Sequence, residues 1–131
     1  MSGVGSWDPD ETEIDDALLS ALIAAATQLE DASLGLDDEV VRHLAGCIRG
    51  GTDVWGEAAA AHDDEDLVTL IKVLTVAEAK LPGCEAGAQS PVIPLAAELK
   101  RRHAYPDDLT AWIKAHTSNR FLPHGSLMDR L

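Results

Sequence analysis

Apolar residues recur every three or four positions along much of this chain, in stretches that end at glycine or proline. This spacing matches the 3.6-residue turn of a helix and not the two-residue repeat of a strand. Glycine favours the position after a helix and proline cannot continue one, so Gly50-Gly51 and Pro82-Gly83 read as helix ends. The longest such stripe consists of Ile14, Leu18, Leu22, Ala25 and Leu29.

The composition points to helices as well. Apolar residues make up 46% of the 131 positions, yet only five residues are aromatic and alanine supplies much of the apolar share. Alanine has the highest helix propensity and little volume, which suits closely packed helices, and strand-favouring runs are nearly absent. We expect an all-α fold: a single compact bundle of five to six helices with short connections. Residues 1–9 are predicted to be a flexible acidic leader and 10–131 a single helical domain.

Capping residues give the expected boundaries. The first helix is predicted over 11–31, with Asp10 and Glu13 at capping-box spacing. Later helices are expected to start after Asp37, at Thr52 or Asp53, after Asp63 or Asp64, after Ser90-Pro91 and after Tyr105–Asp108, with a last half-helix over 127–131.

Charge is distributed unevenly along the chain. Residues 1–66 hold 17 acidic and two basic side chains, a net −15, whereas 67–131 hold six acidic and eight basic ones, a net +2. The acidic half repels nucleic acid and anionic membranes and attracts basic surfaces. We therefore expect a protein partner with a basic surface, and neither nucleic acid nor a membrane.

Cellular location and cofactors follow from weaker signals. The N-terminus lacks the pattern of an export signal, and the apolar segment 17–27 is too short to span a bilayer. Cys47 and Cys84 are read as reduced thiols, in the core and in a loop, in a cytoplasmic protein. The scattered histidines show no zinc spacing, so no cofactor is expected.

Basic and aromatic residues gather towards the C-terminus. The candidate partner-binding residues are Arg101, Arg102, Trp112, Lys114, Arg120 and Phe121. Arginine and aromatic side chains dominate interface energetics. Two other interpretations remain open. The basic residues can pair with the acidic half, within the molecule or across a homodimer, and the aromatic ones can cover the end of the bundle.

One string suggests an enzyme. His62-Asp63, with His43 upstream and Asp107 or Asp108 downstream, resembles the pattern of the HD-domain metal-dependent phosphohydrolases. The resemblance covers residues 43–108. It implies a metal held by His43, His62, Asp63 and Asp108, which would polarise a phosphate and generate hydroxide. The competing interpretation is a capped helix start, because the pair runs into Asp64-Glu65-Asp66, whereas the family's pair lies within a helix.

The sequence thus supports two functions from different classes. We expect a non-catalytic interaction protein (an adaptor, inhibitor or regulatory subunit) that binds through its charged surface. The alternative is a small phosphohydrolase that uses the four metal-binding candidates.

Overall fold

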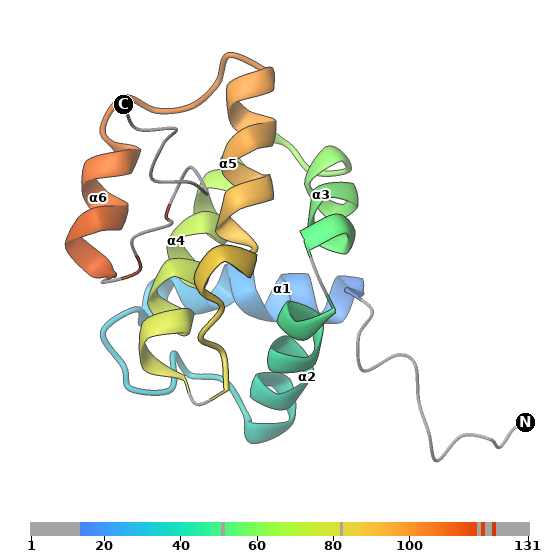
Figure 1. Ribbon diagram of the computed structural model, residues 1–131. Coiled ribbons are helices and arrows are strands. Elements are labelled where there is room, and N and C mark those ends of the chain that lie inside the picture. The colour runs from blue at the N-terminus through green and yellow to red at the C-terminus, as the bar shows by residue number, and fades with distance from the viewer. Residues whose placement is uncertain (1–13, 51, 82, 118, 120–121, 123–131) are drawn as a thin grey trace, which may run out of the picture.

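A computed structural model describes residues 14–50, 52–81, 83–117, 119 and 122. These residues form six α-helices and two short 3-10 turns, and no strand occurs among them (Figure 1). The all-α bundle expected from the sequence is therefore confirmed. The α-helices are α1 (Asp16–Ala24), α2 (Asp38–Arg49), α3 (Thr52–Ala60), α4 (Asp64–Lys80), α5 (Val92–Arg101) and α6 (Leu109–His116), and the 3-10 turns are η2 (Ala25–Gln28) and η3 (Gly87–Gln89).

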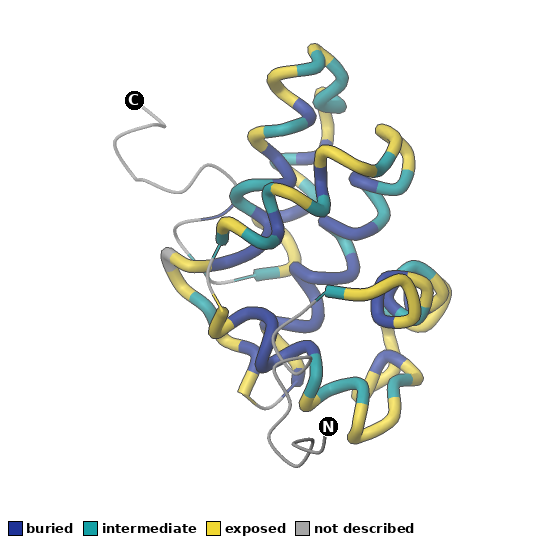
Figure 2. The backbone as a smooth tube through the Cα atoms, turned by 90° about the vertical axis from the view of Figure 1, so that its right-hand side faces the viewer, coloured by how far each residue is buried: buried dark blue, intermediate teal, exposed yellow. Residues whose placement is uncertain are grey.

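Helix α4 is the centre of the bundle. It is the longest helix, and α1, α5 and α6 all pack against it, while α3 packs against α5 and α2 against α1. Buried positions gather where the helices face one another, and exposed positions lie on the outside (Figure 2). Among the described residues no helix combines the length and apolarity that crossing a membrane requires.

Small side chains let α3 and α5 approach closely. Ala59 of α3 and Ala96 of α5 are buried, and a Cβ added at Gly56 of α3 would lie 4.0 Å from Cβ of Pro94 of α5. Trp55 is the one large aromatic side chain that is fully buried in the described core, and its indole N–H donates to the carbonyl oxygen of Cys47 at 3.2 Å. The alanine-rich composition thus produces a core of tightly packed helices around a single indole ring.

Side-chain caps explain several helix starts. Asp15 accepts the N–H of Leu18, and Asp63 accepts the N–H of Asp66, each at 2.8 Å. These bonds satisfy amide groups that have no partner within the helix.

The first helix is shorter than the predicted 11–31. It begins at Asp16, after the Asp15 cap, and beyond Ala24 the chain tightens into η2 and then a turn. The Asp10–Glu13 capping box, the predicted leader 1–9 and the half-helix 127–131 lie outside the described residues.

The turn after η2 is strained and well bonded. Leu34 and Gly35 have φ angles of 55° and 69°, and Leu34 is buried. The carboxylate of Asp31 accepts the N–H groups of Ser33 and Gly35 and the Ser33 hydroxyl, which lowers the pKa of that carboxyl. From α4, the Lys80 ammonium donates to the carbonyl oxygen of Leu29 at 2.8 Å.

Candidate functional site

The C-terminal end of α5 carries two of the predicted partner-binding residues. The helix ends in a Schellman motif: the His103 N–H donates to the Lys100 carbonyl and the Ala104 N–H to the Leu99 carbonyl. His103 accordingly adopts a φ of 59°, a conformation that glycine tolerates best. This turn fixes the direction in which Arg101 and Arg102 leave the helix.

Arg102 binds three helices at once. Its guanidinium donates to the carboxylates of Glu98 on α5 at 2.8 Å and of Asp64 in the first turn of α4 at 2.9 Å. It also donates to the carbonyl oxygen of Ala59 at 3.1 Å, in the last turn of α3. We call Arg102, Glu98, Asp64 and this carbonyl the Arg102 clamp. A guanidinium suits this position because its donors spread in a fixed planar fork.

Arg101 shares the Glu98 carboxylate but leaves most of its side chain in solvent. Its guanidinium donates two hydrogen bonds to Glu98, while 69% of the side chain stays exposed. The hydrogen bonds from Arg101 and Arg102 lower the pKa of Glu98 to about 2. Both arginines are therefore engaged within the molecule. In the part of the chain that the structure describes, only Arg102 pairs with the acidic half, through Asp64, because Glu98 belongs to the second half of the chain.

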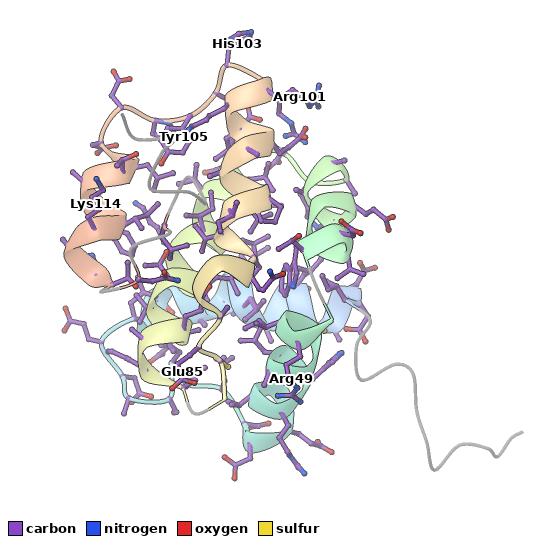
Figure 3. The ribbon with its side chains drawn as sticks, viewed as in Figure 1. Arg49, Glu85, Arg101, His103, Tyr105 and Lys114 are labelled. Carbon is purple, nitrogen blue, oxygen red and sulfur yellow. The ribbon has the colours of Figure 1, made fainter. Side chains whose placement is uncertain are left out.

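The α6 candidates lie elsewhere. Trp112 is half-buried, the ring of His116 stacks on it at 3.9 Å, and the Lys72 ammonium lies 5.3 Å from its ring centre. Arg101 lies at the end of α5, whereas Lys114 projects from α6 on the other side of the bundle (Figure 3). The described candidates thus occupy two separate places rather than one patch. Arg120 and Phe121 lie outside the described residues.

The four metal-binding candidates occupy different parts of the fold. His43 lies on α2, while Asp108 is exposed at the start of α6. The Nδ1 of His62 lies 2.8 Å from the Ala58 carbonyl oxygen, and Asp63 caps α4. Among the described residues, no three His, Cys, Asp or Glu side chains form a group that could hold a metal ion. The His62-Asp63 pair thus lies at a capped helix start.

Exposed carboxylates dominate the first half of the molecule. The described part of residues 14–66 holds 13 acidic side chains, and all but the half-buried Asp66 are exposed. They concentrate at the starts of α1, α2 and α4, on α3 and in the turn after η2. They are Asp15, Asp16, Glu30, Asp31, Asp37, Asp38, Glu39, Asp53, Glu57, Asp63, Asp64, Glu65 and Asp66.

One acidic residue is buried, and it was not among the site residues predicted from the sequence. Glu78, near the end of α4, is only 5% exposed, and burial raises the pKa of its carboxyl to about 7. Its Oε2 accepts the hydroxyl of the fully buried Ser90 at 2.5 Å. The signal was present: Glu78 follows Leu74 by four positions and Ile71 by seven, which places it on the apolar stripe of α4.

Both cysteines are fully buried, and both are reduced thiols. Burial raises the pKa of Cys84 to about 11, with Glu78 and Glu85 adding to the effect and Arg49 opposing it. Burial likewise raises the pKa of Cys47 to about 11. A nucleophilic cysteine must be a thiolate, so both residues act here as small apolar core groups.

The geometry therefore offers an exposed acidic surface, two arginines bound within the molecule and one buried carboxyl. Comparison with models of protein families, with curated proteins and with solved structures gave no match to this chain.

Proposed function

We propose that this chain is a non-catalytic interaction protein whose acidic surface binds a basic surface of a protein partner. It would act as an adaptor, an inhibitor or a regulatory subunit in the cytoplasm. The second half of the chain would supply the scaffold that holds the acidic helices in place.

The observation that carries the proposal is that few of the described acidic side chains form an ion pair with another described residue. Three ion pairs occur among the described residues, all at Arg101 and Arg102, and Asp64 is the only member from the acidic half. The other exposed carboxylates of that half therefore keep their charge available to a partner. These carboxylates lie on a few neighbouring helices and repel each other. Binding to a basic partner would reduce that repulsion.

The carboxylates of α2 and α3 are the best placed. Asp53 and Glu57 lie one helical turn apart, so they share one face of α3. Asp38 and Glu39 lie in the first turn of α2. Both helices lie on the side of the bundle opposite α6 (Figure 1). Such a surface raises the rate of encounter with a basic partner by roughly 10- to 1,000-fold at low salt.

The test compares two variants with equal charge changes. Partners captured from lysate at low salt are purified, and their association rates are measured against salt concentration. We expect Asp53→Asn/Glu57→Gln to slow association at low salt and to flatten its salt dependence. The control Asp107→Asn/Asp108→Asn removes two exposed carboxylates from the start of α6 and should leave the rate close to wild type.

The proposal would be contradicted if the two variants changed the association rate equally, or if the wild-type association rate did not depend on salt concentration. The same measurement on the protein alone reports whether a second copy is the partner. Self-association that depends on Arg101 would replace the basic partner with a homodimer.

A further inference from the structure

The turn between η2 and α2 holds a leucine in an unusual backbone conformation. Leu34 has a φ of 55°, in the left-handed region, and yet it is only 1% exposed. A residue with a Cβ populates that region less by roughly 5- to 30-fold than the right-handed one. Burial of the leucine side chain favours the closed turn. The closed turn is therefore a balance between a buried side chain and a strained backbone.

Local hydrogen bonds give the turn its shape. The Leu34 N–H donates to the carbonyl oxygen of Asp31 at 3.2 Å, and the Leu36 N–H donates to that of Ser33 at 2.9 Å. The Asp31 carboxylate accepts the N–H of Gly35 at 3.1 Å. Each of these bonds joins two residues of the same turn. They order the turn without attaching it to a helix of the bundle.

Lys80 attaches the turn to α4, the centre of the bundle. Its ammonium donates to the carbonyl oxygen of Leu29 at 2.8 Å and to that of Asp31 at 3.5 Å. The same positive charge favours the ionised form of the Asp31 carboxyl, which orders the turn. Because the Lys80 side chain is exposed, this attachment lies at the surface, although the leucine that it helps to hold is buried.

We propose that residues 29–36 form a strap that the charge of Lys80 keeps closed over the core. While the ammonium binds the strap, Leu34 stays buried. When the charge is removed, the strap opens and Leu34 leaves the core together with the half-buried Leu36. Opening relieves the strained φ of Leu34, which offsets part of the lost burial, so the strap opens without unfolding of the helices. This inference does not depend on binding by the acidic surface.

The test is hydrogen exchange of the full-length protein in low concentrations of urea. The amides of Leu34, Gly35 and Leu36 report on the strap, and those of Leu70 and Leu74 report on the buried part of α4. In the wild type we expect the strap amides to exchange faster than the α4 amides and with little dependence on urea. A local opening exposes little surface, and the urea dependence grows with the surface exposed.

Two lysines of α4 give a matched pair of variants. Lys80→Met removes the charge and keeps a long side chain, and we expect the protection of the strap amides to fall roughly 5- to 10-fold. Lys72→Met removes the same charge from the same helix, at a position where the ammonium lies 5.3 Å from the ring centre of Trp112. In that control the protection of the strap should stay within about twofold of wild type.

Unchanged protection of the strap in Lys80→Met would overturn the proposal, as would an equal fall in the two variants. The wild type alone provides a second test that does not require either variant to fold. Exchange of the strap amides that rises with urea as steeply as that of the α4 amides would overturn the proposal. The strap would then open only when the whole protein unfolds.

Discussion

Two glutamates of this protein lie in environments that shift the pKa of the carboxyl in opposite directions. Glu98 is half-buried between two guanidinium groups, which lower the pKa of its carboxyl to about 2. Glu78 lies in the interior, where the described residues that shift its pKa are Ser90 and Asn119 and include no cation, and burial raises that pKa to about 7. The same side chain is thus held as a permanent anion at one end of the bundle and as a titrating group at the other.

The difference has a consequence for pH. A carboxyl with a lowered pKa stabilises the fold above pH 4.5, and that contribution is lost as the pH falls towards 2. A carboxyl with a raised pKa stabilises the fold below pH 4.5, and that contribution is lost as the pH rises through 7. The Arg102 clamp and the buried Glu78 carboxyl therefore respond to acid in opposite directions.

The largest expected effect comes from removing the titration of Glu78. In urea unfolding between pH 4.5 and pH 8, the wild type should lose about 3 kcal/mol of stability relative to Glu78→Gln, as a shift from 4.5 to about 7 implies. No difference between the two proteins would contradict the comparison of the two glutamates.

Ser90→Ala should have the next largest effect. The substitution removes the oxygen that accepts the first amide of α5 and the hydroxyl that donates to the Glu78 carboxyl, so unfolding should become easier by about 2 kcal/mol at pH 8. At pH 5 the loss should be about half as large, because the neutral carboxyl needs its donor less. Equal losses at the two pH values, measured by urea unfolding, would show that the cap alone matters.

The clamp can be dissected with neighbouring arginines. Arg102→Ala removes contacts to α3, α4 and α5 and should lower the melting temperature by about 2–5 °C. Arg101→Ala removes contacts only to Glu98 from a mostly exposed side chain, and such pairs contribute little. Its melting temperature should stay within about 1 °C of wild type. Similar melting temperatures for both variants would show that bridging three helices has no energetic consequence.

His103→Gly should stabilise the protein slightly. At a φ of 59°, a residue with a Cβ is strained where glycine is not. We expect a gain of about 0.5–1 kcal/mol in chemical unfolding, with Lys100→Gly, inside α5, as a destabilising control. A loss of stability at position 103 would mean that the histidine side chain contributes more than its backbone strain costs.

Much of the fold could be predicted from local signals. The starts of α2, α3 and α4 were predicted correctly at Asp37, Thr52 and Asp63. A capping residue and the apolar repeat that follows it lie within a few residues of each other, so both can be recognised in the sequence. The predicted start of α1 was wrong, because local signals alone do not choose among several possible caps. Several acidic residues there could cap a helix, and Asp15 is the one whose carboxylate accepts the N–H of Leu18.

The site residues could be predicted less well. The contact from Arg102 to Asp64 spans 38 positions, and no local pattern specifies such a pair. The sequence therefore left open whether the basic residues pair inside the molecule. Glu78 could be seen to lie on an apolar stripe. The pKa of its carboxyl, however, depends on burial and on Ser90 and Asn119, which come close to it only in the folded chain.

The hydrogen bond from Lys80 to Leu29 closes a long loop of the chain. It joins residues 51 positions apart, with α2, α3 and α4 in between, and its donor side chain is exposed. Next to the acceptor lies the turn in which Leu34 and Gly35 adopt left-handed backbone angles. Acetylation of Lys80 would remove its charge and leave a single N–H. Acetylation at the end of α4 would thus weaken the contact between Lys80 and Leu29 that closes this loop.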